Sequence, residues 1–511
     1  MPIETILIAN RGEIAVRIIR ACREMGIGTV AIYADADRDA RHVRMADRAF
    51  PLVGNAPGDT YLRIDKIVDL AKRSAADAVH PGYGFLAENE NFAQACVDAG
   101  LTFIGPPAAV IARMGSKTAA RASAIAAGAP VVPGTQTPIG PGVSDPEVQR
   151  LADAVGYPLM VKAVAGGGGK GMREVAGAAG LLEAVHRARS EALSAFGDDA
   201  VYFERRLRRA RHIEIQLLAD HHGTVVPFVE RECSVQRRHQ KVIEESPAVR
   251  MPPDLRRRMA EAAASIARTV GYTNAGTIEF LVDDEDRFHF LEMNTRLQVE
   301  HPVTEMVTGV DLVQWQIRIA RGEPLTVSPD QALTPRGHAI ECRVYAEDPD
   351  RQFMPQPGRI TGLTVPGGPG VRDDSGVEAG FEVPIYYDSM ISKLVAWGED
   401  REQARRRMLR AISEYHVGGI PTTLPFFRWM LEQPAFVAGD IDTTTLDAEL
   451  ARRAGEPFLA VEDHHRRVAL LAVAASSFAA ARKAGHPARA TLARPARSGW
   501  GAAARQAAIR K

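Results

Sequence analysis

The sequence has few cysteines and no excess charge of either sign. Four cysteines lie far apart in 511 residues, at positions 22, 96, 233 and 342. This spacing excludes a disulfide scaffold and a cysteine-rich zinc site, and it is typical of proteins in the reducing cytosol. The 63 Lys and Arg residues equal the 63 Asp and Glu residues in number. Because a general nucleic-acid or anionic-membrane binder carries a basic excess, we expect a cytoplasmic protein that binds neither.

Long apolar runs are also missing. The first apolar stretch, residues 6–9, is too short for the core of a signal peptide. The uncharged, mostly apolar run at residues 468–481 has 14 residues, whereas a membrane-spanning helix needs about 20. With 46% hydrophobic and 25% charged residues, the chain has the composition of a soluble globular protein. Its length is enough for about three domains.

The first 115 residues alternate between short strands and helices. Apolar, β-branched segments at 5–9, 29–33, 76–80 and 101–105 predict strands, and apolar residues at helical spacing separate the first two. This order predicts an α/β domain with a Rossmann-like, doubly wound parallel sheet. A dinucleotide site would need Gly-x-Gly-x-x-Gly at the first strand-to-helix turn. The sequence there is Asn-Arg-Gly-Glu, with one glycine, which argues against nicotinamide or flavin binding.

Three further regions follow this domain. Residues 116–330 combine helices with hairpin-like strands, and a Pro- and Gly-rich stretch at 130–141 marks a hinge. Residues 331–447 combine strands, turns and helical segments, and residues 448–511 form an Ala- and Arg-rich tail. Within this tail, residues 456–511 hold three acidic and ten basic residues, a net charge of +7. The tail is either a solvated segment or a docking segment for an acidic partner.

Two apolar strands flank a charged turn between residues 277 and 294, which predicts a β-hairpin. With a symmetric turn, Glu279 faces Glu292 across the ladder, and Asn294 lies on the same face as Glu292. Two carboxylates ~5 Å apart repel by about 3 kcal/mol at an effective dielectric constant of ~20, more than a favourable cross-strand pair contributes. A cation is therefore expected between them, and two carboxylates with an amide oxygen suit Mg²⁺. In the alternative interpretation, both carboxylates point into solvent.

A strand that carries Lys162 leads into the run Gly-Gly-Gly-Gly-Lys-Gly at 166–171. Only nine of the 63 basic residues are Lys, so Lys162 and Lys170 are candidates for a specific role. The glycines leave backbone N–H groups free to surround phosphate oxygens. Because neither Ser nor Thr follows Lys170, the run is not a strand–loop–helix phosphate loop. We interpret it as a mobile flap over a nucleotide, and a flexible linker is the alternative.

Two polar segments are candidates for handling an anion and a proton. Residues 231–241 are dense in hydrogen-bond donors and poor in acceptors, as expected for anion capture or for a solvated basic face. Arg296, Gln298 and Glu300 alternate along the chain, so an extended segment projects all three the same way. An Arg that holds an anion and a Glu that accepts a proton would form an acid–base pair beside the metal. His301, which precedes a proline, is interpreted as structural.

Taken together, these segments resemble biotin carboxylase, a member of the ATP-grasp superfamily. The resemblance covers about residues 3–450 and rests on long motifs in a fixed order. The motifs are residues 8–15, 80–89, 114–117, 162–173, 236–241, 292–305, 337–343 and 386–390. The resemblance implies a mixed α/β and α+β fold. Its parts would be a Rossmann-like domain at 1–115, an ATP-grasp domain at 116–330 with a mobile lid at about 132–205, and a C-terminal biotin carboxylase domain at 331–447.

The resemblance also implies an activity and its partners. The family phosphorylates bicarbonate with MgATP and transfers CO₂ from carboxyphosphate to N1′ of biotin, so ATP and Mg²⁺, as two ions or with Mn²⁺ in their place, are the implied cofactors. A homodimer is implied as well. No Met-Lys-Met biotinylation motif occurs in the sequence, so either the biotin is on a separate carrier chain or this sequence is part of a longer α-subunit. With a separate carrier chain, carboxyltransferase subunits are expected as further partners. Those subunits choose the final acceptor, so an acetyl-, propionyl- or other acyl-CoA carboxylase, as in fatty acid biosynthesis, and a pyruvate carboxylase all stay open.

Individual residues take their expected roles from the resemblance. Matches to ATP-binding positions are Lys117, Lys162, Gly166, Gly167, Gly168, Gly169, Gly171, Glu204, Leu207, His212, Gln236, His239 and Leu281. Matches to the bicarbonate pocket are Lys241, Arg296, Gln298, Val299 and Glu300. Glu300 matches the base that deprotonates bicarbonate, and Arg343 matches the residue that stabilises the biotin enolate, with Tyr83 near the biotin. Lys241 and Arg296 complete the catalytic set, and Glu279, Glu292 and Asn294 match the metal site.

Two other functions stay open. Another ATP-grasp ligase, of the carbamoyl-phosphate or peptide-bond-forming type, is disfavoured by the run Arg-Arg-His-Gln-Lys at 237–241 and by Arg343. A non-catalytic subunit that binds nucleotide and scaffolds a complex would need none of Lys241, Arg296, Glu300 and Arg343.

Overall fold

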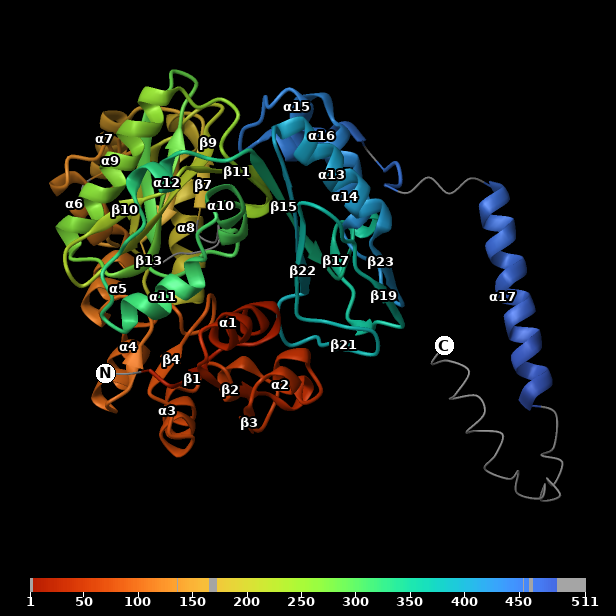
Figure 1. Ribbon diagram of the computed structural model, residues 1–511. Coiled ribbons are helices and arrows are strands. Elements are labelled where there is room, and N and C mark those ends of the chain that lie inside the picture. The colour runs from red at the N-terminus through yellow and green to blue at the C-terminus, as the bar shows by residue number, and fades with distance from the viewer. Residues whose placement is uncertain (1–2, 136, 165–171, 454, 459–462, 485–511) are drawn as a thin grey trace, which may run out of the picture. The chain divides into compact units, whose positions relative to one another are not determined.

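The computed structural model describes residues 3–135, 137–164, 172–453, 455–458 and 463–484 (Figure 1). The chain forms two units, residues 1–456 and 457–511. The glycine-rich run predicted to cover a nucleotide, at 166–171, lies outside the described residues.

The N-terminal part has the parallel sheet that the sequence predicts. Its strand order is β3-β2-β1-β4-β5, with every neighbouring pair parallel. The strands are β1 (Thr5–Ile8), β2 (Gly28–Tyr33), β3 (Arg48–Pro51), β4 (Ala78–His80) and β5 (Thr102–Phe103). The helices are α1 (Gly12–Glu24), α2 (Arg41–Met45), α3 (Ile64–Arg73), α4 (Glu90–Asp98) and α5 (Ala108–Gly115).

Helix α1 and the loop after β4 are held together at one end of this sheet. Ile14 and Ile18 recur at helical spacing and are buried in the core beside β1. The Asn10 amide, between β1 and α1, donates to the carbonyl oxygens of Pro81 at 2.7 Å and Tyr83 at 2.8 Å. The loop that carries Tyr83 is therefore fixed close to the N-terminus of α1.

A second, larger sheet in which all neighbouring strands are antiparallel forms the central sheet of the main unit (Figure 1). Its strand order is β14-β13-β9-β11-β12-β15-β22-β20, with β10 paired to β9. Because β12 pairs with β15, this sheet runs across the boundary expected at 330/331. The strands are β9 (Arg211–Ala219), β10 (Val225–Pro227), β11 (Arg231–Arg237), β12 (Gln240–Ser246), β13 (Asn274–Val282), β14 (Phe288–Asn294), β15 (His338–Tyr345), β20 (Val371–Ser375) and β22 (Met390–Gly398).

A small third sheet, in the order β7-β6-β8, lies within the predicted lid. Its strands are β6 (Leu159–Ala163), β7 (Met172–Val175) and β8 (Val201–Arg205), and the neighbouring helices are α6 (Lys117–Ala126), α7 (Asp145–Val155) and α8 (Leu181–Phe196). Alternate apolar residues of β6 and β8, including Leu159, Val161 and Phe203, are buried under α7 and α8 in a core of their own. The lid sheet thus has its own hydrophobic core.

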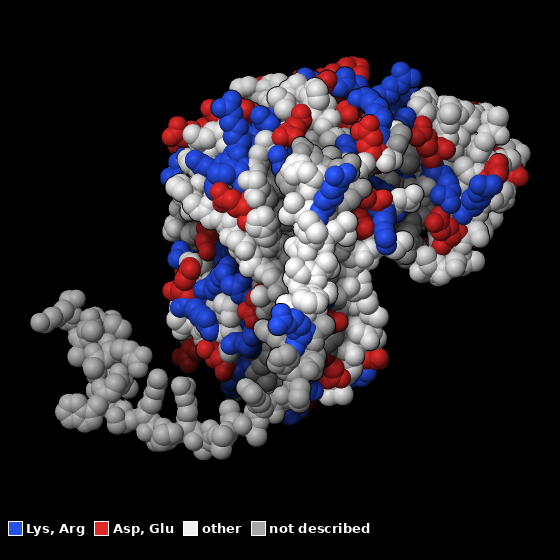
Figure 2. Space-filling model, turned by 90° about the vertical axis from the view of Figure 1, so that its right-hand side faces the viewer, with Lys and Arg blue, Asp and Glu red and all other residues white. Residues whose placement is uncertain are grey.

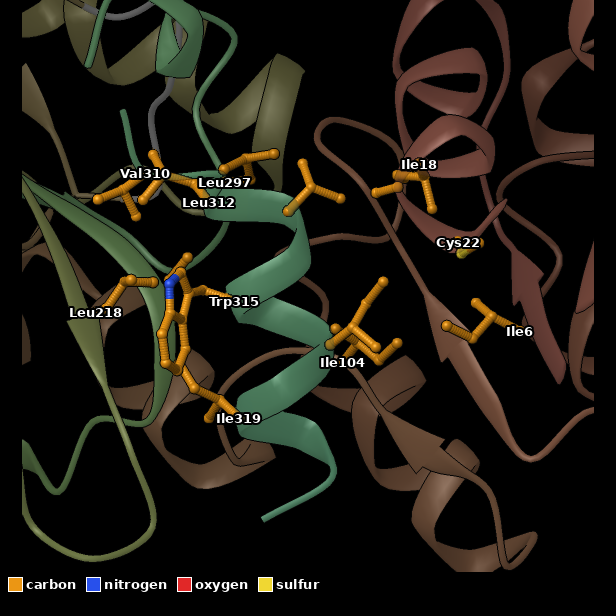
Figure 3. Packing of buried hydrophobic residues seen from close by; sticks show 14 of the residues in the cluster. Ile6, Ile18, Cys22, Ile104, Leu218, Leu297, Val310, Leu312, Trp315 and Ile319 are labelled. Atoms are coloured by element: carbon orange, nitrogen blue, oxygen red, sulfur yellow. The ribbon is translucent and has the colours of Figure 1, made fainter. Parts of the chain in front are cut away.

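Helix α11 (Leu312–Ala320) joins the N-terminal part to the central sheet (Figure 3). Its side chains pack into one cluster that includes Ile6 and Ile104 from the N-terminal sheet and Leu218 from β9. Trp315 of α11 lies within this cluster, 8% exposed. Burial of this shared apolar surface explains why the parts of residues 1–456 form one unit.

The remaining elements cover the central sheet and complete the C-terminal part. The helices are α9 (Pro253–Val270), α10 (His301–Thr308), α12 (Pro329–Leu333), α13 (Arg401–Glu414), α14 (Leu424–Glu432), α15 (Pro434–Val437) and α16 (Thr445–Arg453). The short strands are β16 (Glu347–Asp348), β17 (Met354–Pro355), β18 (Gly358–Arg359), β19 (Gly362–Thr364), β21 (Glu382–Val383) and β23 (His416–Gly418). Helix α16 contacts β11 and buries Leu446. It therefore belongs to the main unit, not to the tail that the sequence suggests from residue 448.

The tail contains one long helix in its described part, α17 (Asp463–Ala484), where the uncharged run at 468–481 predicts a helix. Among the described residues, no helix combines the length and the apolar character needed to cross a membrane. On the face of the main unit shown in Figure 2, acidic and basic side chains are intermixed, as the zero net charge leads one to expect.

Candidate active site

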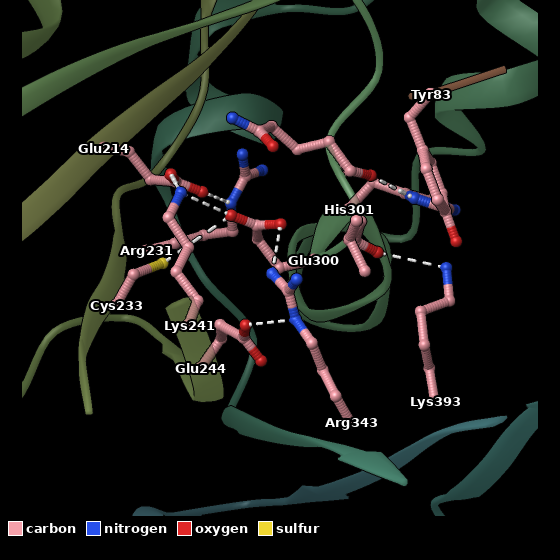
Figure 4. A network of polar contacts seen from close by, with 12 residues as sticks. Tyr83, Glu214, Arg231, Cys233, Lys241, Glu244, Glu300, His301, Arg343 and Lys393 are labelled. Atoms are coloured by element: carbon pink, nitrogen blue, oxygen red, sulfur yellow. Dashed lines mark hydrogen bonds and ion pairs between the residues drawn. The ribbon is translucent and has the colours of Figure 1, made fainter. Parts of the chain in front are cut away.

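Lys241 on β12 lies at the centre of a cluster of carboxylates. Its ammonium donates to Glu214 at 2.5 Å, to Glu279 at 2.8 Å and to Glu300 at 2.7 Å (Figure 4 shows Glu214 and Glu300). Burial alone would lower the pKa of Lys241, but the three carboxylates, with Glu214 the largest influence, raise it well above its usual value. Burial alone would likewise raise the pKa of Glu279 and of Glu300, and Lys241 holds both well below their usual range. Lys241 is therefore a cation, and both Glu residues are carboxylates.

Glu300 is held between two cations. Its second carboxylate oxygen accepts a hydrogen bond from Arg343 at 2.9 Å, and the same guanidinium donates to Glu244 at 2.6 Å. The side chain of Glu300 is 0% exposed. Burial raises the pKa of Glu244 to about 7, against the opposing effect of Arg343. Near neutral pH, Glu300 is therefore ionised, whereas Glu244 is only partly ionised.

Arg231 fixes the position of Glu214 in this cluster. It is fully buried on β11, pairs with Glu214, and donates to Gln216 at 3.0 Å, Thr304 at 2.9 Å and Thr277 at 3.1 Å. Such a guanidinium, with its donors used in several directions, fixes the carboxylate that faces Lys241.

Sequence reasoning missed Glu214, Glu244 and the structural role of Arg231. A signal was present on β9, where His212, Glu214 and Gln216 alternate with Ile213, Ile215 and Leu217. In a strand, this alternation puts the three polar side chains on one face. All three are buried, and buried polar residues in such a row indicate a site rather than a solvated surface.

The segment after β14 brings three predicted residues together. Arg296 donates to Gln298 at 3.1 Å and to Asn294 at 3.0 Å, and Gln298 in turn donates to Glu279 at 3.1 Å. Arg296 also bonds Glu88, 2.8 Å away, in the motif at 80–89. This segment therefore lies against the metal-ligand candidate Glu279. Residues 295–300 form bends and a turn, not the extended segment that the alternation predicts.

The β13–β14 hairpin opposes the two glutamates that the sequence predicts to face each other. Glu279 pairs directly with Glu292, next to a β-bulge. The positive charge expected beside them is supplied at Glu279 by Lys241, and Nε2 of His212 lies 3.1 Å from Glu279 Oε2. The solvent-facing alternative is wrong for Glu279, which is buried, whereas Glu292 is exposed to solvent. Desolvation of its carboxyl group by neighbouring protein atoms, and then the charge of Glu279, nevertheless raise the pKa of Glu292.

The donor set of this hairpin fits a divalent cation. A cation between Glu279 and Glu292 would remove the repulsion that raises the pKa of Glu292, and carboxylate oxygens suit Mg²⁺. Asn294 currently donates its amide to Glu279 at 2.7 Å. Within the described residues, the metal-type donors that come within 4.8 Å of one another are His212, Glu214 and Glu279, and Glu214, Cys233 and Glu300.

The predicted nucleotide residues come from the lid sheet and from α6. Lys162 on β6 pairs with Glu204 on β8, and both are largely buried. Lys117, the first residue of α6, has a pKa lowered mainly by burial and also by Lys162, while Glu292 and Glu204 oppose the shift. The lysines predicted to bind phosphates therefore lie near one another and near Glu292.

The other described residues that are predicted to bind the nucleotide lie on or beside strands of the central sheet. Leu281 on β13 pairs with His212 on β9, and the buried amide of Gln236 donates to the carbonyl of Cys233 at 2.9 Å. His239 is exposed in the β11–β12 turn, where it has a φ of 66°. Leu207 is half-buried between β8 and β9. Gly166, Gly167, Gly168, Gly169 and Gly171 lie outside the described residues.

The fold and the site together define an ATP-dependent ligase. Residues 116–328 match the family model for the carbamoyl-phosphate synthase L chain, ATP binding domain. Residues 2–111 match the biotin carboxylase N-terminal domain, and residues 341–448 match the biotin carboxylase C-terminal domain. The chain belongs to the biotin carboxylase family, and its activity is the ATP-dependent carboxylation of biotin.

Relatives and solved structures agree with this assignment. The chain is 52% identical to one subunit of the pyruvate carboxylase of Methanothermobacter thermautotrophicus, over 86% of this chain and 89% of that protein. It is 50% identical to the biotin carboxylase of a Nostoc species, over 87% of this chain and 98% of that protein. Among structures, the biotin carboxylase domain dimer of Hydrogenobacter thermophilus 2-oxoglutarate carboxylase, in complex with MgADP and bicarbonate, is similar. Its TM-score is 0.85 at 44% identity, covering 90% of this chain and 100% of that chain.

Proposed function

We propose that the cluster around Lys241 is the place where bicarbonate is activated, and that the product is transferred to biotin carried on a separate chain. In the first step, a bicarbonate oxygen attacks the γ-phosphorus of ATP, the bond to ADP breaks, and carboxyphosphate forms. In the second step, the C–O bond of carboxyphosphate breaks to give CO₂ and phosphate. Phosphate accepts the N1′ proton of biotin, and N1′ forms the new bond to CO₂. The observation that supports this proposal best is the placement of Glu300 between Lys241 and Arg343, with Arg296 on the adjoining segment.

Glu300 is the proposed base. In the free protein, Lys241 and Arg343 hold its pKa low, which makes it a weak base. A bicarbonate anion bound beside Lys241 and Arg296 would compete with Glu300 for Lys241. This competition would raise the pKa of Glu300. Glu300 would then accept the proton of bicarbonate as the anion becomes a nucleophile. Gln298 and Val299 complete the proposed bicarbonate pocket, because they belong to the same segment.

Lys117, Lys162 and the lid are proposed to bind the nucleotide. The two lysines would face the phosphate oxygens. The other residues that match ATP-binding positions would contact the nucleotide from the neighbouring strands. Glu279, Glu292 and Asn294 would hold Mg²⁺, as two ions or with Mn²⁺ in its place, and the metal would neutralise charge on the phosphoryl group in transfer. Closure of the lid would exclude water, which matters because carboxyphosphate hydrolyses.

Arg343 and Tyr83 are proposed to face the biotin ring. Arg343 already supports two carboxylates, Glu244 and Glu300. Removal of the N1′ proton leaves negative charge on the ureido oxygen, which a guanidinium stabilises. Since the pKa of Glu244 is about 7, protonation of Glu244 would leave more of the Arg343 charge available to that oxygen.

The partners are proposed from the relatives. We infer a biotin carboxyl carrier chain, carboxyltransferase subunits and a cytoplasmic location, together with a homodimer, because a similar structure is a domain dimer. Relatives include the pyruvate carboxylase chain named above and the α-subunit of methylcrotonoyl-CoA carboxylase of Dictyostelium discoideum, of which this chain covers 63%. The final acceptor is therefore an acyl-CoA or a keto acid. We also propose the domain boundaries 1–115, 116–330 and 331–447.

The test is ATP turnover in the presence of bicarbonate, with and without free biotin. We expect bicarbonate-dependent ADP release that biotin stimulates, together with carboxybiotin formation. A ligase of the carbamoyl-phosphate or peptide type would show no response to biotin, and a scaffold protein would bind ATP without turnover. Identification of the chains that purify with this one would name the acceptor class.

A further inference from the structure

Lys393 on β22 is completely buried, with a side chain 0% exposed. Its ammonium donates to the main-chain oxygen of Val299 at 3.0 Å and lies 3.1 Å from Oε1 of Glu13 (Figure 4 shows Lys393 and Tyr83). It also lies 5.6 Å from the centre of the Tyr83 ring. A buried ammonium requires such partners, because the loss of hydration without them is costly.

These partners come from separate parts of the chain. Glu13 is in the first turn of α1, and the phenol of Tyr83, in the loop after β4, donates to the same Oε1 atom of Glu13. Val299 immediately precedes Glu300, the proposed base. Lys393 therefore links the residue proposed to face biotin to the segment proposed to bind bicarbonate.

We propose that Lys393 and Glu13 are positioning residues for carboxyl transfer. They hold the phenol of Tyr83 and the segment 299–300 at a fixed separation, so that biotin and the activated carboxyl group meet. The inference rests on the roles proposed above for Tyr83 and Glu300. Lys393 and Glu13 act through Tyr83 and Val299, and a misplacement of about 1 Å can cost on the order of 100-fold in rate.

Glu13 gives this arrangement a dependence on pH. It faces Lys393 on β22, Arg372 and Asp374 on β20, and Tyr83. Burial raises the pKa of Glu13 to about 7, although Lys393 opposes the shift. As pH falls through this value, Glu13 becomes neutral and holds Lys393 less strongly. We therefore expect kcat/KM for biotin to decrease on the acid side partly through Glu13.

The first experiment replaces the ammonium. Lys393→Met should raise KM for free biotin by about tenfold, a change of ~1.4 kcal/mol, and leave the Kd for MgATP unchanged by calorimetry. Lys66→Met is the matched control, because Lys66 in the N-terminal part also donates to main-chain carbonyls. The control should leave both constants unchanged. If Lys393→Met lowers Tm but leaves both kcat and KM for biotin at the parent values, Lys393 is only structural and the proposal is wrong.

The second experiment keeps the size and one acceptor oxygen of Glu13 and removes its charge. It provides the test if Lys393→Met does not fold. Glu13→Gln should lower kcat/KM for biotin above about pH 7 and flatten its dependence between about pH 6 and pH 8. Glu244 also titrates near pH 7 and contributes to both profiles. The deciding quantity is therefore the ratio of kcat/KM for biotin in the parent to that in Glu13→Gln, measured across this pH range. A ratio that does not change with pH contradicts the role of Glu13.

A double-mutant cycle shows whether Glu13 acts through Tyr83. If it does, the effects of Glu13→Gln and Tyr83→Phe on KM for biotin are not additive, whereas additive effects would separate Glu13 from Tyr83 and overturn that link. Failure of the proposed function looks different, because the parent protein itself would then show no biotin-stimulated ATP turnover.

Discussion

Replacing Lys241 by methionine removes the ammonium on which three buried carboxylates converge. The two distances of 2.7 and 2.8 Å, to Glu300 and Glu279, correspond to an attraction of about 6 kcal/mol each at an effective dielectric constant of ~20. The desolvation of Lys241 and of the carboxylates offsets much of this. Removal of one partner of a buried pair is expected to cost about 3–5 kcal/mol in the free energy of unfolding.

The cost should depend on pH. The pKa values of Glu279 and Glu300 are lowered in the folded protein, so their stabilising contribution is present above the unfolded Glu value of about 4.3 and is lost as pH falls through the folded values. In Lys241→Met both pKa values rise, because the cation is gone. The difference in stability between parent and variant should therefore be largest near neutral pH and should narrow as pH falls towards about 5.

The assay is chemical denaturation of the parent and Lys241→Met at about pH 7.5 and about pH 5.5, with turnover measured in parallel. Turnover should fall by about 100-fold or more, as for other removed charge-stabilising groups. Lys66→Met is the matched control, because its ammonium contacts carbonyl groups and its effect should not depend on pH. Lys241→Arg, which keeps the charge, should recover part of the stability. A loss for Lys241→Met that is equal at both pH values would refute the electrostatic reasoning.

Other predictions follow from the same contacts. Glu300→Gln should abolish carboxylation while MgATP still binds; turnover like that of the parent would remove Glu300 as the base. Lys162→Ala leaves the buried Glu204 without this partner and should weaken nucleotide binding, which calorimetry measures. Glu341 is buried, neither of its carboxylate oxygens accepts a hydrogen bond among the described residues, and burial and Glu244 raise its pKa well above the usual value. A carboxyl group with a raised folded pKa makes the protein less stable as pH rises. Glu341→Gln should therefore stabilise the protein, increasingly so from about pH 5 upwards, which Tm measured across pH would show. Deletion of residues 457–511 should preserve activity with free biotin, because α16 remains in place, and should impair capture of partner chains; retained capture would refute the docking role.

The sequence alone predicted those features that depend on short-range pattern. The sequence predicts that Glu279 and Glu292 are paired, and the structure has that pairing. In the structure the pairing depends on a β-bulge between Glu279 and Phe280, because the register beside the turn would pair Glu279 with Leu291. The parallel sheet of the N-terminal part follows from alternating strands and helices, since parallel neighbours need a crossover between them. The alternation of Arg296, Gln298 and Glu300 likewise predicted that they act together. The roles of individual site residues came from the resemblance to a family, not from these patterns.

The tertiary structure decided which charges surround Lys241. Glu214 and Glu300 are separated from Lys241 by 27 and 59 residues, and their meeting depends on the strand order β9-β11-β12 and on the segment before α10. The pairing of β12 with β15 brings Arg343 to Glu244, and β22 beside β15 brings Lys393 to Val299. Local pattern fixes which face of a strand a residue occupies, because side chains alternate with a period of two. It does not fix which strand lies next to it, since that depends on long-range packing of the whole sheet.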